Sequence, residues 1–337
     1  MDQCRTPLRF TRSIHWIRRS SPRTRGCGRW GWPRPTLSSC PSPRPGRCRS
    51  APTPSSIRML RPCPRATWWE RDRPGRCRCA SIAPPATTDE PLPVLLYFHG
   101  GGFALNSIDT HDRLHRLLAL RSGAAVLAVA YSKAPEHRFP HQNEEALAAL
   151  RWIARHGADY GLDSARIAVG GDSAGANLAL GVALAARAPG EPRVSFALLF
   201  YGMFAHDFHT LSHKRYGDGR YGLTTARMRW YWERYLGGVE PTRDPRAAPL
   251  LADLRGLPPV LLLAAGLDCL RDDSVRLAER LAAADVPYAL SVYDSLPHSF
   301  AVLTRLVEAA DGAVTRAALA VRDALAVRDA LAVRPLP

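Results

Sequence analysis

The sequence predicts an α/β fold, with a doubly wound, mostly parallel sheet, helices on both faces and a helical cap. Three observations support this prediction. From residue 91 onward, short apolar runs alternate with segments of helical periodicity, which is the pattern of strand–helix–strand units. The apolar runs are continuous, as is typical of strands buried on both faces. The alternation breaks between residues 201 and 237, where an aromatic-rich insertion interrupts it.

Each expected element has its own local signal. The run 94–98 is a strand that enters a glycine-rich loop, and 124–130 is a second buried run. Apolar residues with helical spacing occupy residues 143–155. The remaining expected strands are 166–170, 196–200, 260–264 and 288–293, and the remaining helices are 174–187, 274–284 and one from about Ser299. The insertion, about 202–237, has the length of a cap over an active site and contains Trp230, Tyr231, Trp232 and Tyr235.

The N-terminal quarter of the chain differs in charge from the rest. Residues 1–90 contain 19 Arg, no Lys and 5 acidic residues, whereas the other 247 residues contain 27 basic and 25 acidic residues. The net charge of +16 is therefore concentrated at the N-terminus, and the part that can fold is nearly neutral. A nucleic-acid-binding domain should carry basic residues on one face of that domain. A nucleic-acid-binding protein with a basic arm is thus the weakest reading, and no nucleic-acid partner is expected.

Residues 1–88 also lack sustained strand or helix periodicity, so they cannot bury enough apolar surface to offset the entropy of ordering. They nevertheless contain five Trp and seven of the eight Cys. Such a composition is what a GC-rich gene yields when it is read out of frame. With suitable codons, shifting the frame turns residues 77–84 into an alternating, strand-like sequence. We expect residues 1–88 to be disordered or frame-shifted, and residues 89–317 to form the main domain.

The cysteines do not indicate a metal site. The seven N-terminal ones form no CxxC pair and have no partnering His cluster, although a disulfide framework remains an alternative. Cys269 is expected to be a reduced thiol. No run of 18 apolar residues occurs, so no membrane span is expected.

The C-terminal segment, residues 318–337, repeats the hexad Ala-Leu-Ala-Val-Arg-Asp. Six residues advance a helix by about 240° beyond a full turn, so Leu319, Leu325 and Leu331 point to different sides. No single apolar face results, which excludes a coiled coil. The tail is interpreted as a duplicated extension of the last helix without a function of its own.

A nucleophile motif stands between an expected strand and an expected helix. It reads Gly171-Asp172-Ser173-Ala174-Gly175 and fits the pattern G-x-S-x-G. The two glycines allow a tight turn that lifts the Ser173 hydroxyl above the sheet and directs the next helix N-terminus at a developing negative charge. The bare motif is also compatible with a glycine-rich helix start, but its strand–turn–helix context favours a nucleophilic serine.

A glycine-rich loop follows the first of these strands and reads His99-Gly100-Gly101-Gly102-Phe103. Three glycines let backbone N–H groups approach a substrate oxygen, as an oxyanion hole requires. A phosphate cradle would need a Gly-Lys-Ser/Thr ending or a G-x-G-x-x-G helix start, and neither is present. His99 precedes the nucleophile, which is the wrong chain order for a base, so we expect it to position the loop.

A serine nucleophile needs a base, and the base needs an acid that orients it. The order serine, acid, histidine selects Asp268 and His298, each of which follows an expected strand. Both then lie at the carboxyl ends of parallel strands, where ligand-binding loops belong. Asp272 and Asp273 are rival acids, but they fall on the next helix and are interpreted as its N-terminal charges.

Three further histidines, His206, His209 and His213, lie in the insertion with near-helical spacing. This spacing is compatible with a metal site. No acid-rich partner set lies nearby, however, so they are interpreted as solvated cap residues, and no metal is expected.

The two motifs, with Asp268 and His298, resemble the hormone-sensitive-lipase family of α/β-hydrolases. Closer detail is similar to the bacterial acetyl esterase branch, in the stretches Asp109-Thr110-His111-Asp112-Arg113, Pro135-Glu136 with Arg138-Phe139-Pro140, and Leu270-Arg271-Asp272-Asp273-Ser274. The similarity runs from about Pro91 to Asp311. It implies a cytoplasmic serine carboxylesterase that acts on short-chain acyl esters through an acyl-enzyme, needs no cofactor, and has Ser173, Asp268 and His298 as its triad.

The resemblance also assigns supporting roles. The oxyanion donors would be the backbone N–H groups of Gly101, Gly102 and Ala174, and Asn177 would brace the turn that carries the nucleophile. The expected partner is a small-molecule ester, and the expected state is a monomer or homodimer. The family builds part of its cap from the N-terminal region, which here is the Arg-rich segment. A non-catalytic ligand-binding homologue is the alternative, but all of the catalytic residue types are present.

Overall fold

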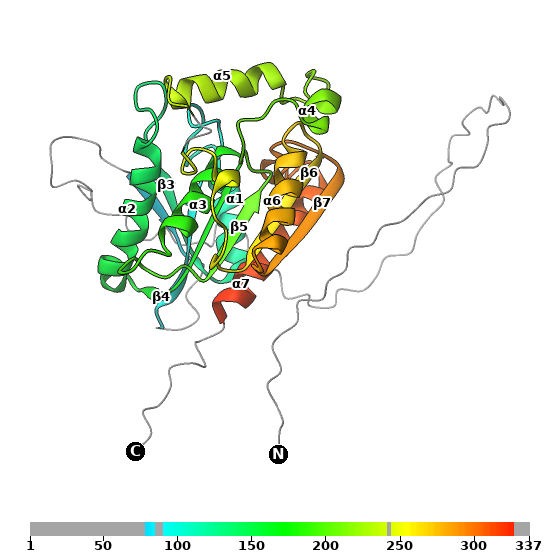
Figure 1. The fold of residues 1–337 in the computed structure, drawn as a ribbon. Coiled ribbons are helices and arrows are strands. Elements are labelled where there is room, and N and C mark those ends of the chain that lie inside the picture. The colour runs from blue at the N-terminus through cyan, green and yellow to red at the C-terminus, as the bar shows by residue number, and fades with distance from the viewer. Residues whose placement is uncertain (1–77, 85–89, 241–243, 327–337) are drawn as a thin grey trace, which may run out of the picture. The chain divides into compact units, whose positions relative to one another are not determined.

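The computed structural model describes residues 78–84, 90–240 and 244–326 (Figure 1). The described residues form a seven-stranded sheet in the order β1-β3-β2-β4-β5-β6-β7. The strands are β1 (Arg78–Ile82), β2 (Leu92–Phe98), β3 (Ala125–Ala130), β4 (Leu162–Asp172), β5 (Phe196–Phe200), β6 (Val260–Leu267) and β7 (Tyr288–Pro297). Strands β2 to β7 pair in parallel, and β1 pairs antiparallel with β3 at the edge.

The strand order reverses beside β2, because the chain passes from β2 to β3 on one side and then crosses to β4 on the other. In open parallel sheets, ligands bind at the carboxyl ends of the strands at such a switch point. The register places Phe98 of β2 opposite Gly171 of β4, and Asp172 opposite Phe200 of β5. The loops after β2, β4 and β5 therefore begin side by side.

Helices cover both faces of the sheet (Figure 1). They are α1 (Asp112–Ser122), α2 (His141–His156), α3 (Ala174–Ala185), α4 (Leu211–Tyr216), α5 (Thr225–Leu236), α6 (Arg271–Ala283) and α7 (Glu308–Ala326). Apolar side chains of α2, α3 and α6 share one core cluster with Leu96 and Phe98. Those of α1 and α7 share the other with Leu95 and Tyr97, because alternate residues of β2 point to opposite faces. The predicted doubly wound α/β fold is confirmed.

The six strands expected from residue 94 onward are all present, and several are longer than expected. The helix expected from about Ser299 begins only at Glu308. Ser299 has a left-handed backbone, with φ of 63°, and residues 300–302 form a single 3-10 turn. A right-handed α-helix cannot run through such a residue. Helix α1 and strand β1 were not expected.

The packed domain extends past both predicted bounds, 89 and 317. Strand β1 lies within the segment 1–88, and the Ile82 side chain is 1% exposed in the core. At the other end α7 continues to Ala326 and buries Val321 and Leu325, whereas Leu319 is 37% exposed. Most of the Arg-rich segment and the end of the hexad repeat lie outside the described residues. No helix in the described part has the length and apolar character needed to cross a bilayer.

The insertion between β5 and β6 carries α4 and α5, which lie above one end of the sheet in Figure 1. Each helix begins at a threonine whose side chain caps it: Thr210 accepts from the His213 N–H, and Thr224 accepts from the Arg227 N–H. The inner face of α5 buries Met228, among others. A helical cap was expected here.

Candidate active site

Ser173 lies in the turn between β4 and α3. Its backbone has φ of 54° and ψ of −118°, a strained conformation for a residue with a side chain. The flanking glycines are required by close packing: a Cβ at Gly171 would collide with the Gly175 carbonyl, and a Cβ at Gly175 with the Phe98 carbonyl. The turn therefore presents the Ser173 hydroxyl at the carboxyl end of the sheet.

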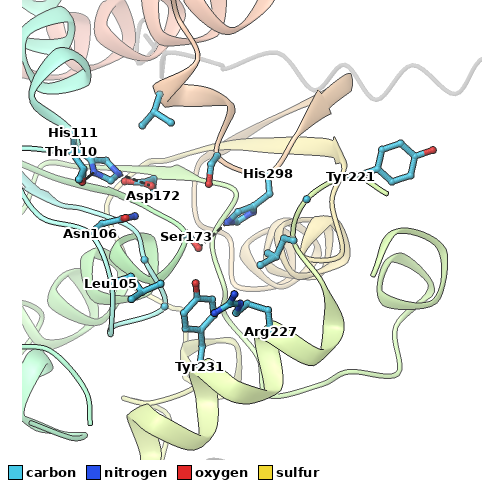
Figure 2. Close-up of a pocket in the computed structure, with 16 residues that line it drawn as sticks. Leu105, Asn106, Thr110, His111, Asp172, Ser173, Tyr221, Arg227, Tyr231 and His298 are labelled. Atoms are coloured by element: carbon cyan, nitrogen blue, oxygen red, sulfur yellow. Dashed lines mark hydrogen bonds and ion pairs between the residues drawn. The ribbon is translucent and has the colours of Figure 1, made fainter. Parts of the chain in front are cut away.

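The structure brings the three predicted catalytic residues together. His298 Nε2 lies 3.0 Å from Ser173 Oγ, and its Nδ1 lies 2.7 Å from Asp268 Oδ2 (Figure 2). A carboxylate only accepts hydrogen bonds, so we assign Nδ1–H as the donor to Asp268 and Nε2 as the acceptor from the Ser173 hydroxyl. The Asp268 side chain is fully buried, and its Oδ1 accepts from the Leu270 N–H at 3.0 Å. This geometry can move a proton from serine to histidine.

An aromatic side chain that the sequence did not single out packs against the histidine. The Tyr201 ring meets the His298 ring edge-on, with 4.9 Å between centroids, and contacts Phe300 at the same distance. Tyr201 directly follows β5, at the same carboxyl end as the triad. Its position directly after a buried strand is the sequence signal that could have identified Tyr201 as a site residue. The ring limits the orientations that His298 can adopt.

The predicted oxyanion loop lies beside the nucleophile. Gly101 and Gly102 have φ of 127° and 60°, and both line the cavity that contains Ser173. The Gly101 carbonyl accepts from the Leu105 N–H at 2.8 Å, which turns the loop away from the sheet. Ala174 is the first residue of α3, so its N–H has no acceptor within the helix. Gly101 and Gly102 thus line the same cavity as Ser173, and Ala174 directly follows the nucleophile in the chain.

A buried ion pair supports this loop from behind. Asp172 Oδ1 accepts from the Gly100 N–H at 3.0 Å and from the Tyr97 hydroxyl at 3.1 Å, and Oδ2 faces His111 Nε2 at 3.3 Å. Burial alone would raise the pKa of Asp172, but the charge and hydrogen bond of His111 lower it below its ordinary value. Burial also opposes the charge on His111, yet Asp172 raises the pKa of that imidazole. The pair ties α1 to the loop after β2.

His99 is held in place by its neighbours. Its ring stacks on Tyr131 with 4.5 Å between centroids, Nδ1 lies 2.7 Å from the Gly100 carbonyl, and Nε2 lies 2.9 Å from Lys133 Nζ. Burial, and then the Lys133 charge, lower the pKa of His99 to about 3. The imidazole is therefore neutral at physiological pH and can accept from Lys133.

The two rival acids lie in the first turn of α6, but their side chains have other partners. Asp272 accepts from the Ser212 N–H at 2.9 Å. Asp273 is buried, and its Oδ2 accepts from the Phe204 and Ala205 N–H groups at 2.7 and 3.0 Å. Burial raises the pKa of Asp273 to about 7. The interpretation of Asp273 as a helix-end charge was incomplete, because it anchors the segment that leads from β5 to the cap.

Asn177 also holds this segment. Its Nδ2 donates to the Met203 carbonyl and to the Ala247 carbonyl, both at 2.9 Å. The contacts therefore join α3 to the segments that precede and follow the two cap helices. The Met203 N–H in turn donates to the Ser173 carbonyl at 3.3 Å, and the role of Asn177 in bracing the serine turn stays a prediction.

A cavity of about 440 Å³ opens above Ser173 and His298. The cap supplies Tyr231 and Arg227 from α5, and Figure 2 shows the Tyr231 hydroxyl directed toward the nucleophile and the Arg227 side chain beside the Tyr231 ring. The Tyr231 ring covers Gly102 so closely that a Cβ there would overlap it. The remaining wall comes mainly from the loops after β2 and β7 and from the chain just before α5.

The histidines of the insertion do not converge. His206 packs edge-on against Trp232, and His213 Nδ1 lies 2.9 Å from Thr225 Oγ1. Within the described ranges no three His, Cys, Asp or Glu side chains are arranged to hold a metal ion. Cys269 is a buried free thiol whose pKa burial raises.

Residues 95–302 match a protein family described as having the alpha/beta hydrolase fold. The chain belongs to this α/β-hydrolase family. Esterase LipI of Mycobacterium tuberculosis is 41% identical over 244 residues, which cover 71% of this chain and 75% of LipI. An ethyl acetate hydrolase of Pseudomonas putida is 35% identical over 232 residues, covering 68% of this chain and 72% of that protein.

Solved structures of esterases have the same fold as this chain. A thermostable esterase from Pseudomonas putida superimposes with a TM-score of 0.75 and 34% identity, covering 82% of this chain and 86% of that one. A hyperthermophilic esterase from the archaeon Pyrobaculum calidifontis superimposes with a TM-score of 0.71 and 36% identity, covering 74% of this chain and 80% of that one. The predicted family resemblance is confirmed.

Proposed function

We propose that this chain is a serine carboxylesterase that hydrolyses short-chain acyl esters through an acyl-enzyme intermediate. One observation carries the proposal: Ser173, His298 and Asp268 form a continuous chain of hydrogen bonds at the floor of the cavity. The relatives are named as esterases, carboxylesterases and an ethyl acetate hydrolase, which confirms the predicted class of ester-hydrolysing enzyme. A non-catalytic role is not favoured.

In the acylation step, Ser173 Oγ attacks the ester carbonyl carbon while His298 Nε2 takes the hydroxyl proton. The buried Asp268 carboxylate holds the Nδ1–H and stabilises the imidazolium that forms. The carbonyl oxygen becomes an oxyanion, which the N–H groups of Gly101, Gly102 and Ala174 stabilise. When the tetrahedral intermediate collapses, His298 gives its proton to the leaving alcohol, and the acyl group stays on Ser173.

Deacylation repeats these steps with water. His298 takes a proton from the water, whose oxygen attacks the acyl carbon, and the same three N–H groups stabilise the second oxyanion. His298 then returns the proton to Ser173 Oγ, and the carboxylic acid leaves. The Asp172–His111 pair does not enter either step, and we assign it the role of holding Gly100 and thereby the oxyanion loop.

The cavity size supports small esters, because about 440 Å³ lies near the lower end of typical small-molecule sites. The side chain of Tyr231 over Gly102 narrows the space beside the nucleophile. The proposal includes a small-molecule ester as the partner, a cytoplasmic location and a monomeric or homodimeric state. It also assigns no separate function to residues 318–337, of which residues 318–326 belong to the packed helix α7.

The proposal is tested with 4-nitrophenyl acetate, butyrate and octanoate and with a fluorophosphonate probe. We expect turnover of acetate and butyrate to exceed that of octanoate, and we expect covalent labelling at Ser173 by peptide mass spectrometry. Prior labelling should abolish turnover. Labelling at another serine, or turnover that survives complete labelling of Ser173, would contradict the proposed mechanism.

A further inference from the structure

The cap places an exposed arginine on the wall of the catalytic cavity. Arg227 lies in the first turn of α5 and lines the same cavity as Ser173 and His298. Figure 2 shows its guanidinium beside the Tyr231 ring, whose hydroxyl is directed toward Ser173. A charged side chain at this position meets any ester that enters the cavity.

The described residues give Arg227 no carboxylate partner, whereas two arginines outside α5 each have one. Arg220 pairs with Asp218 at 2.7 Å, and Arg276 pairs with Asp207 at 2.8 Å. The Arg227 guanidinium instead lies 5.7 Å from the centre of the Trp230 ring and 5.9 Å from that of Tyr231. The rings partly fix the guanidinium while leaving its N–H donors available.

The other charges around the cavity do not neutralise Arg227. Asp172 also lines the cavity, but it is buried and its negative charge is balanced by His111. The first turn of α5 contains no acidic residue, so the positive end of the helix dipole adds to the arginine charge. Burial raises the pKa of Tyr231, and the positive charge of Arg227 acts against this rise. The field of Arg227 therefore reaches into the cavity.

We propose that Arg227 forms an anion subsite and that the preferred substrates are esters that carry a carboxylate near the scissile bond. This inference rests on the proposed esterase function and names its substrate class. A guanidinium binds a carboxylate with two parallel hydrogen bonds, and the flanking rings reduce the entropy that it loses on binding. The carboxylate can belong to the acyl part, as in a half-ester of a dicarboxylic acid, or to the alcohol part, as in an acylated hydroxy acid.

Two pairs of near-isosteric esters test the subsite and separate these sources. Monomethyl glutarate against methyl valerate places the charge on the acyl side. Acetoxyacetate against propyl acetate places it on the alcohol side. Hydrolysis of all four is followed by titrating the acid released at constant pH, and the measured quantity is the ratio of kcat/KM for the charged ester to that for its neutral partner.

The wild-type protein should prefer the charged member of at least one pair, and Arg227→Met should lower that ratio by about three- to ten-fold, the size of one partly exposed charge pair. Arg227→Lys should retain part of the preference. Adding salt should reduce the ratio in the wild type and leave it nearly constant in Arg227→Met.

Arg234→Met is the matched control. Arg234 also lies on α5 and stacks on Trp230, at 5.4 Å, but it does not line the cavity. Its loss should leave both ratios unchanged. Equal ratios in wild type and Arg227→Met, or equal effects of the two methionine variants, would overturn the subsite. If neutral esters are turned over but neither charged ester is preferred, the subsite fails while the esterase function stands. If the wild type neither hydrolyses any of the four esters nor reacts with the fluorophosphonate, both fail.

Discussion

The charged side chains on the floor of the cavity differ from those on its cap in burial and in pairing. On the floor, charged side chains are buried and paired: Asp268 contacts His298, and Asp172 contacts His111. On the cap, Arg227 is exposed and rests on aromatic rings. A buried pair has one low-energy arrangement, whereas an exposed cation can meet many anions. The floor holds the residues of the proposed reaction, and the cap holds the proposed anion subsite.

Mutations on the floor and on the cap should affect the turnover of different esters in different ways. A change on the floor should lower turnover of every ester by a similar factor, because the transition-state charge is the same for all of them. A change on the cap should alter the ratio between esters and leave the best rate nearly intact.

The largest effect is expected for Ser173→Ala. Removing the nucleophile should lower kcat for 4-nitrophenyl butyrate by about 10⁴-fold or more, with the fold retained in circular dichroism. The exposed Ser295→Ala serves as the control and should behave as the wild type. Near-wild-type turnover in Ser173→Ala would show that the floor does not supply the nucleophile.

Asp268→Asn should follow, with a loss in kcat of about 10³- to 10⁴-fold. An amide at this position can donate to His298 Nδ1 and so favour the tautomer that cannot accept the serine proton. Asp272→Asn is the matched control, because Asp272 lies four residues away and contacts Ser212 instead. Should Asp272→Asn cause the larger loss, the acid has been assigned to the wrong side chain.

Gly102→Ala probes the point where floor and cap meet. A methyl group there would strain a backbone with φ of 60° and overlap the Tyr231 ring, so the oxyanion N–H would shift. We expect a loss in kcat of about 10²-fold or more. Gly123→Ala is the control: its φ of 74° imposes similar strain, but no atom lies within 4 Å of the added carbon. It should cost about 1 kcal/mol of stability and leave kcat unchanged.

The sequence predicted the floor well because its signals are local. Continuous apolar runs marked the strands, and the turn at Ser173 and the positions of Asp268 and His298 follow from chain order on parallel strands. All three side chains meet in the structure. Exact strand ends were missed, because register with neighbouring strands, and not local periodicity, determines where β4 and β7 stop.

The cap and the supporting contacts could not be predicted in the same way. Asp172 and His111 are 61 residues apart in sequence and meet because α1 packs on the face of the sheet that Tyr97 of β2 also faces. Asp273 reaches Phe204 and Ala205 across almost 70 residues. Neither pair leaves a periodic or spaced signal. The insertion was recognised from its aromatic content, but which of its side chains face the cavity depends on how α5 lies on the loop at Gly102.

The smallest effect on activity is expected for Asp273, which joins the floor to the cap. Asp172 and Asp273 are both buried, but a histidine keeps Asp172 charged, whereas burial raises the pKa of Asp273 to about 7. Between about pH 4 and pH 7 the folded protein then binds this proton more tightly than the unfolded chain. The stability that Asp273 contributes is therefore complete below this range and is lost as the pH rises through it.

Asp273→Asn removes this titration while the amide oxygen can still accept from Phe204 and Ala205. We expect the wild type to lose up to about 3 kcal/mol more stability than the variant between pH 5 and pH 8, measured by urea unfolding. Other titrating groups are common to both proteins and cancel in the difference. Turnover should fall by less than about ten-fold, because the triad keeps its contacts. Identical pH slopes would mean that Asp273 is charged in the folded protein, and the segment entering the cap would then be held by an ionised side chain, as the oxyanion loop is held by Asp172.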